Sequence, residues 1–279
     1  MKHIKHIFST VLLLICISAT TFAQLTLPAP SPKASVMQAV GLTDITIEYS
    51  SPGVKSRTIF GDLVPYDKLW RTGANSATKI TFSKDVTIGT TKVAKGTYSL
   101  FTIPGKTEWT VILNKNSSAS TDEYKQAEDA VRITSKAEVA PMRERLSFQI
   151  VDFEDAKATI SLEWEKVRVS FPVTMSTDEQ AMENIKSNLG STWRNYNAAA
   201  RYMMDKKDYE AALKYSNQSL SLSDEWFNNW TKANILSKMG KNKEAYEFAG
   251  KAKTLGDKNP DGFFFKDQVE KALVDWPKQ

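Results

Sequence analysis

The sequence predicts an α+β chain in which an antiparallel β-sandwich or barrel is followed by an all-α region of helical repeats. Two observations carry this prediction. Up to about residue 175, short runs alternate apolar and polar residues with the period of two that is typical of strands. From Thr177 onward, apolar residues recur every three or four positions, as in amphipathic helices. We therefore expect a β domain over 34–175 and a helical domain over 176–279.

The first 23 residues have the features of a secretory signal peptide. Lys2 and Lys5 precede an apolar run, and Ala23 supplies a small residue for cleavage before Gln24. The run is shorter than the roughly 20 residues that a membrane-spanning helix needs. We therefore expect a periplasmic or secreted protein with no transmembrane segment after cleavage.

Removal of this segment would also change the chemistry open to the protein. His3, His6 and Cys16 are the only histidines and the only cysteine of the chain. Without them, triads, cysteine nucleophiles and the usual zinc sites are excluded, so we expect neither a histidine- or cysteine-dependent enzyme nor a metal site. A lipoprotein signal is the alternative for this segment, but Ile15 stands where a small residue should precede Cys16.

The charge balance argues against nucleic acid as a partner. Cleavage would leave 35 basic and 32 acidic residues, and the net charge would fall from +5 to +3. The charges are mixed along the chain and form no basic stripe. The sequence also has no glycine-rich phosphate loop and no dinucleotide fingerprint, so no cofactor is expected.

The β pattern follows an extended, proline-containing leader over 24–33. A tight connection at Glu165-Lys166 suggests that the last two expected strands form a hairpin. Ser120 and Glu123 form a capping box that predicts a short helix over 122–130. The clearest strand patterns lie at 44–49, 97–103, 109–113, 146–150, 160–164 and 167–173.

The helical half contains a faint repeat at an offset of 33 residues. Trp193 aligns with Trp226, and Ala200 with Ala233. Small residues at the alanine positions would let paired helices approach closely, so the region resembles two tetratricopeptide repeats with a flanking helix at each end. A generic helical bundle is the alternative. The expected helices lie at about 181–189, 193–205, 209–222, 224–239, 244–255 and 264–273.

Two runs of the β half are distinctive. One extends from Ser56-Arg57-Thr58-Ile59-Phe60-Gly61 to Ser76-Ala77-Thr78, and the other is Lys95-Gly96-Thr97-Tyr98-Ser99-Leu100-Phe101, with Trp109 after it. They resemble the bacterial family called domain of unknown function 2911 over about residues 34–175. The resemblance implies a signal peptide and, in some members, a helical repeat region. It implies no catalytic residues, because the family has no established activity.

The first of these runs is also the best candidate for a ligand site. Long connections in compact domains are usually functional or locally packed. Arg57 and Arg71 could clamp a carboxylate or phosphate, and Tyr66 and Trp70 could stack on a sugar or aromatic ring. Asn75 could fix the orientation of such a ligand. The alternative is a structural plug that covers a barrel mouth or sheet end, with its arginines paired to nearby aspartates.

The helical half offers a second candidate surface. In tetratricopeptide-like pairs, the first helix of each repeat lines a concave groove. An exposed tryptophan beside arginines and asparagines would suit the tail of a protein partner. The alternative is that Trp230 packs against a neighbouring helix or the β domain. The residues expected to face the groove are Arg194, Asn197, Arg201, Phe227, Trp230 and Asn234.

These observations leave two functional hypotheses and a purely structural role as a third. The first is an exported, non-enzymatic binding module of the cell envelope, in which the helices recruit a protein partner and the β domain holds a small or glycan ligand. The second is a hydrolase that acts on glycans or envelope polymers through two carboxylates, which would face each other about 5 to 10 Å apart. The carboxylate candidates are Glu48, Asp62, Asp67, Glu108, Glu163 and Glu165.

Overall fold

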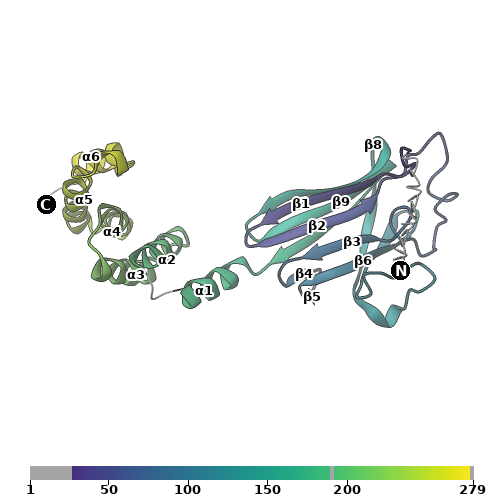
Figure 1. Cartoon of the computed structure of the whole chain (residues 1–279), viewed down its shortest axis with the longest axis horizontal. Helices are drawn as coiled ribbons and strands as arrows, with labels where there is room; N and C mark the ends of the chain where they lie inside the picture. The colour runs from purple at the N-terminus through teal and green to yellow at the C-terminus, as the bar shows by residue number, and fades with distance from the viewer. Residues whose placement is uncertain (1–26, 189–191, 277–279) are drawn as a thin grey trace, which may run out of the picture.

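The computed structural model describes residues 27–188 and 192–276. The expected signal peptide, with its histidines and cysteine, lies outside the described residues. Within them, strands come first and helices follow, so the chain is α+β overall (Figure 1). None of the described helices is long and apolar enough to cross a bilayer.

The strands of the described residues form one antiparallel sheet of nine. Its order is β1-β2-β3-β6-β7-β8-β9-β4-β5, and among the described residues β1 and β5 are its two edges. The sheet is therefore open, and it does not close into the barrel that was one of the two expectations. The strands are β1 (Lys33–Val40), β2 (Thr43–Ser50), β3 (Thr78–Phe82), β4 (Val86–Ile88), β5 (Thr91–Val93), β6 (Gly96–Pro104), β7 (Glu108–Asn114), β8 (Asp129–Glu154) and β9 (Lys157–Met175).

Strand β8 joins the two halves of this sheet. Its first part pairs with β7, from Asp129 to Lys136, and its remainder pairs with β9. Both halves contribute buried side chains to one apolar core, which includes Ile47 of β2 and Trp164 of β9. The ring of Tyr49 in β2 meets that of Phe148 in β8 edge-on, with 5.0 Å between centroids. The sheet thus folds back over a shared core.

The expected hairpin at Glu165-Lys166 is wrong. Strand β9 continues through both residues, and Glu165 adopts a left-handed backbone with φ of 55°. The register of β8 against β9 shifts on either side of the pair Arg143 and Glu165. An irregularity inside a strand and a tight turn interrupt the apolar alternation in the same way, so only the partner strand distinguishes them.

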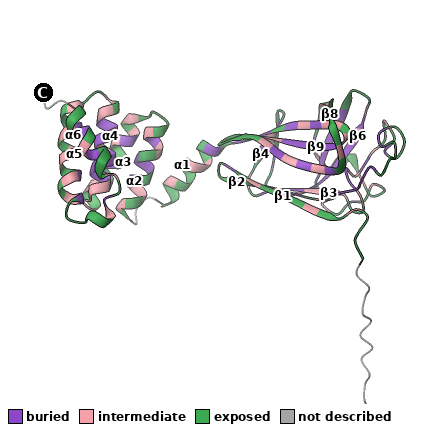
Figure 2. Ribbon diagram, turned by 90° about the horizontal axis from the view of Figure 1, so that it is seen from above, coloured by how far each residue is buried: buried purple, intermediate pink, exposed green. Residues whose placement is uncertain are grey.

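The helical region consists, in the described residues, of six helices packed largely in pairs. Helix α2 packs against α3, and α4 packs against α5. The second pair begins 33 residues after the first, because α2 starts at Trp193 and α4 at Trp226. Ala200 and Ala233 are fully buried, as the repeat predicts. Buried and exposed stretches alternate along these helices (Figure 2). The helices are α1 (Thr177–Asn188), α2 (Trp193–Asp205), α3 (Tyr209–Leu222), α4 (Trp226–Lys238), α5 (Asn242–Gly256) and α6 (Lys266–Asp275).

Helix α1 connects the sheet to this region. Only Ser176 separates β9 from α1. The Thr177 hydroxyl donates to the carbonyl of Asp155 in the β8–β9 turn. On the other side, the Asp178 carboxylate accepts a hydrogen bond of 2.7 Å from Tyr202 and pairs with Lys206 of the chain after α2. Helix α1 is therefore tied to both halves of the molecule.

Candidate functional site

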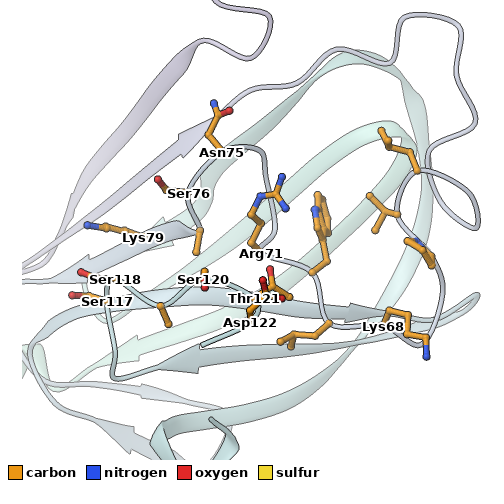
Figure 3. A pocket seen from close by; sticks show the side chains of 17 residues that line it. Lys68, Arg71, Asn75, Ser76, Lys79, Ser117, Ser118, Ser120, Thr121 and Asp122 are labelled. Atoms are coloured by element: carbon orange, nitrogen blue, oxygen red, sulfur yellow. The ribbon is translucent and has the colours of Figure 1, made fainter. Parts of the chain in front are cut away.

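A pocket of about 780 Å³ lies between two long connections of the β half (Figure 3). One connection joins β2 to β3, and the other joins β7 to β8. Side chains from both connections and from the start of β3 form its walls. The polar side chains that line it are Lys68, Arg71, Asn75, Ser76, Lys79, Ser117, Ser118, Ser120, Thr121 and Asp122.

The first connection is anchored by Trp70. Its backbone exchanges two hydrogen bonds with Thr102 of β6, at 2.7 and 2.9 Å. Its ring is only 8% exposed and stacks on that of Trp164, with 5.9 Å between centroids. The indole N–H donates to the carbonyl of Gly73 at 3.1 Å. This anchor fixes the backbone next to Arg71.

Thr72 fixes the other side of Arg71. It is fully buried and has a left-handed backbone with φ of 54°. That conformation is an outlier for a β-branched residue and costs on the order of 1–3 kcal/mol. Three hydrogen bonds hold this conformation. The Thr72 hydroxyl lies 3.1 Å from the Thr102 hydroxyl and 3.3 Å from the Trp70 carbonyl oxygen. The Thr72 carbonyl oxygen accepts a hydrogen bond of 2.8 Å from the Thr78 hydroxyl. Such strain is typical of functional sites.

Arg71 is the central feature of the pocket. Its side chain is half-buried, and its Nε is shielded from solvent with no hydrogen-bond partner among the described residues. The structure also gives Arg71, Lys68 and Lys79 no ion pair with any described residue. Asp122 is the sole acid among the lining residues, so the pocket carries a net charge of about +2. A buried donor without an acceptor costs free energy, which an anionic ligand would recover.

The second connection is built onto the outer face of the sheet. Ala119 is buried against Phe101 and Ile112, whose side chains point away from the main core. Asn114 is fully buried, and its amide donates to the backbone of Lys125 at 3.0 Å. These contacts close the loop on itself and place the serines of 117–120 opposite Arg71.

The capping box of this connection is present, but the expected helix over 122–130 is not. Backbone and hydroxyl of Ser120 donate to the Glu123 carboxylate at 3.0 and 2.8 Å, and the Glu123 amide donates to the Ser120 hydroxyl at 3.3 Å. The hydrogen bond from the Ser120 backbone has the largest effect on the pKa of Glu123, followed by that from the Ser120 hydroxyl, and both lower it. The chain then forms only a single 3₁₀ turn at Gln126–Glu128, because Asp129 already begins β8.

Of the five residues predicted for a ligand site, three line this pocket. They are Trp70, Arg71 and Asn75. Asn75 is exposed, and its amide donates to the Ser50 hydroxyl at 3.2 Å. Trp70 offers little ring surface to a ligand, because it is only 8% exposed and packs against Trp164, Phe60 and Trp109. Trp70 thus packs into the core, whereas the side chain of Arg71 lines the pocket.

The other two predicted residues lie outside the pocket. Arg57 is exposed and donates to the carbonyls of Gly53 and Val54, at 2.6 and 3.0 Å, so it closes its own turn. Tyr66 packs its ring against Gly61, where an added Cβ would lie 2.8 Å from the ring. Both contact their own connection, and the structure does not bring Arg57 into the pocket that Arg71 lines.

Sequence reasoning did not select Lys68, Lys79 or the loop 117–122. Lys79 lies in β3, where the neighbouring Thr78 and Ile80 are buried, so its side chain faces outward to the pocket. The 117–122 loop is about 40 residues further along the chain, and its capping box was the only local signal. Lys79 and the 117–122 loop come together because β3 pairs with β6 and β6 pairs with β7.

Of the residues predicted to face the groove of the helical half, some are buried and others are exposed. Trp230 is 9% exposed and stacks on Trp276, so the expectation of an exposed tryptophan is corrected. Asn197 is buried, and Asn234 donates to the backbone of Trp230 at 2.8 Å. Two exposed arginines lie over partly exposed rings at the surface. The guanidinium carbon of Arg194 is 4.6 Å from the ring centroid of Trp193, and that of Arg201 is 5.4 Å from the ring centroid of Phe227.

The carboxylate candidates are not paired in the pocket. Glu163 is buried between Arg143 and Arg168, and its carboxylate oxygens lie 2.6 Å from the Nε of each. Burial raises the pKa of Glu163, but the hydrogen bonds and charges of the two arginines outweigh burial and lower it overall. None of the six carboxylate candidates lines the pocket, and the described residues contain no cluster of three metal-ligating side chains.

A comparison with protein families agrees with the resemblance noted in the sequence. The model of a family described as "Protein of unknown function (DUF2911)" matches residues 31–173, which is just over half of the chain. The chain belongs to this family. The matched DUF2911 region contains both connections that line the pocket, whereas the helices lie outside it. Neither a curated protein nor a solved structure shows a significant match to the chain.

Proposed function

We propose that the protein is an exported binding module of the cell envelope whose DUF2911 domain holds an anionic ligand in the pocket around Arg71. The observation that carries this proposal is the buried Nε of Arg71, which has no hydrogen-bond partner in the part of the chain that the structure describes and is flanked by the buried Trp70 and the strained Thr72. Proteins rarely leave such a group without an acceptor. A carboxylate, sulfate or phosphate would accept two parallel hydrogen bonds from the Arg71 guanidinium.

Binding fits the pocket better than hydrolysis does. Glycoside hydrolysis through protein carboxylates needs two of them on either side of the bond. Asp122 has no second carboxylate opposite it in the lining, and Glu163 is held by two arginines elsewhere. The surplus of positive charge instead suits the retention of an anion.

We assign the helical region the role of docking a protein partner. Its pairs of helices, offset by 33 residues, support the tetratricopeptide-like interpretation. Arg201 and the partly exposed Phe227 would contact the partner, together with Phe264, which is 70% exposed and lies 6.3 Å from the Phe227 ring. Trp230 supports these residues from within the core.

The substitution Arg71→Gln tests the ligand site. The ligands are sulfate, phosphate and galacturonate at matched ionic strength, with galactose as the neutral control. At a hundredfold excess over Kd, a ligand that binds only the folded state adds about 2.7 kcal/mol and raises Tm by at least about 5 °C. We expect this rise with at least one anion for the unsubstituted chain and none for Arg71→Gln.

Lys106→Gln is the matched control, because Lys106 is exposed in the β6–β7 turn and lies outside the pocket. It should respond to anions as the unsubstituted chain does. Equal stabilisation of the Arg71→Gln variant, or no anion response in the unsubstituted chain, would contradict the proposal.

Export is tested on the protein recovered from its native cells. Cleavage after Ala23 predicts that amino-terminal sequencing begins at Gln24, in a fraction outside the cytoplasm. A protein that retains Met1 and fractionates with the cytoplasm would exclude export. A lipid attached to Cys16 would instead support the lipoprotein alternative.

A further inference from the structure

The pocket around Arg71 continues into a second hollow of about 460 Å³. The two share Asn75, Ser76, Ala77 and Lys79, so they adjoin, and together they are called the groove below. The second hollow extends over the sheet toward its edge strand. The residues that it adds are Lys33, Ala34 and Ser35 of β1, and Glu48, Tyr49 and Ser50 of β2.

The groove crosses the strands. Ser35, Glu48 and Lys79 are register partners on β1, β2 and β3, and all three line the second hollow. Adjacent strands lie about 4.8 Å apart, so this part of the groove spans roughly 10 Å before it reaches Arg71. A ligand that fills both hollows must therefore be elongated.

The cations of the groove are distributed along it. Figure 3 shows Lys68 and Lys79 on opposite sides of Arg71, and Lys33 belongs to the second hollow alone. No ion pair joins any of the four cations to a described residue. A single small anion could contact only part of this set. Two carboxylates, Glu48 and Asp122, also line the groove, so its net charge is about +2. Several anionic groups at intervals along one ligand would contact all four cations.

The other groups of the groove favour a sugar chain over an acidic peptide. Hydroxyls of serines and a threonine line the groove together with the cations, and they can exchange hydrogen bonds with sugar hydroxyls. The ring of Tyr49, which follows Glu48 in β2, packs against the core and Phe148, so recognition of sugars in the groove would rest on these hydroxyls. An extended peptide usually adds to a free sheet edge, whereas this groove runs across the face.

We propose that the groove binds a linear oligosaccharide with one anionic group on each sugar. This inference rests on the proposed function, because it extends the anion site at Arg71. The sugar nearest Arg71 presents its carboxylate or sulfate to the guanidinium, and further acidic sugars reach Lys79 and Lys33. The recognised chemistry is a regularly spaced row of anions on a hydroxyl-rich chain.

Calorimetric titration of the full chain tests this proposal. The probes are galacturonate oligomers of one, two and three sugars, the methyl esters of the same oligomers, a sulfated oligosaccharide of equal length and poly-glutamate. We expect Kd to fall at least tenfold from one to three sugars, and the esters to bind at least tenfold more weakly. The sulfated probe shows whether sulfate replaces carboxylate.

Two substitutions separate the parts of the groove. Lys33→Gln should raise Kd for the three-sugar probe at least threefold and leave the single sugar unchanged, whereas Arg71→Gln should weaken both. Single-sugar binding that depends on Arg71 but does not strengthen with length would overturn this inference and leave the anion site intact. Absence of all anion binding would overturn both the anion site and the oligosaccharide inference. Tighter binding of poly-glutamate than of the three-sugar probe would exclude an acidic glycan as the ligand.

Discussion

At the scale of single residues, backbone strain and unpaired charge coincide at Arg71. Thr72 is a β-branched residue in a left-handed conformation, and its carbonyl and hydroxyl are fully engaged. The sequence indicated Arg71 only together with Arg57, as two arginines of a long connection that could clamp an anion, and it left a structural plug as the alternative. It could not reveal that Arg57 would be engaged by the carbonyls of its own turn.

Glu163 gives a prediction about pH at this scale. Its pKa in the folded protein is lowered below the ordinary 4.5, so its ion pairs stabilise the fold above that pH and are lost as pH falls through the lowered value. Glu163→Gln should decrease the free energy of unfolding by about 2 kcal/mol at pH 7, since two half-exposed arginines lose their acceptor. Denaturant titrations should show this difference narrowing below pH 4.5.

Glu108→Gln provides the control for this effect. Glu108 is exposed at the start of β7, and no described residue forms an ion pair with it. Its substitution should change stability by less than about 0.5 kcal/mol at either pH. A penalty for Glu163→Gln that is equally large at pH 7 and pH 3 would contradict the assigned ionisation.

At the scale of elements, the helices were more predictable than the strands. The expected ranges 193–205 and 209–222 coincide with α2 and α3, because helical periodicity and capping are local properties. Strand alternation located β2, β6 and β7 within a residue or two. It failed at β9, where the expected turn is an irregularity within one strand, and it gave no sign that β8 would run for 26 residues. Strand continuity depends on partners distant in sequence.

The helix pairs give a second prediction. Ala200 is fully buried where α2 meets α3 and α4, while Ala198 on the same helix is exposed. Ala200→Leu adds volume to a closely packed contact and should destabilise the helical region by about 1–3 kcal/mol. Ala198→Leu adds the same volume outside the contact and should have little effect. Urea titrations followed by circular dichroism at 222 nm would compare them, and equal stability of the two variants would contradict the close packing.

At the scale of the whole molecule, the pocket belongs to the β half alone. Its lining comes from residues 63–79 and 117–122, and the helices contribute none of it. The sequence indicated two regions and the order of their folds. It could not indicate that the β2–β3 and β7–β8 connections would meet, because that meeting requires the intervening strands to pair side by side.

This separation predicts that the chain 1–188 retains ligand binding. The cut keeps α1 and therefore its contacts with the β8–β9 turn, through Thr177, and with β2, through Gln180. Titration with the anion that stabilises the full chain should give a Kd within threefold of the original value. A loss of binding in a fragment that still shows cooperative unfolding would mean that the helices take part in the site.

The direct passage from β9 into α1, with Ser176 alone between them, bears on how this molecule would respond to mechanical load. If a partner held the helices and a surface-bound polymer held the sheet, tension would enter along the axis of β9. That strand is hydrogen-bonded to β8 and β4 on its two sides, by bonds perpendicular to the pull. They would be sheared together rather than opened one after another, which makes the junction suited to a tether.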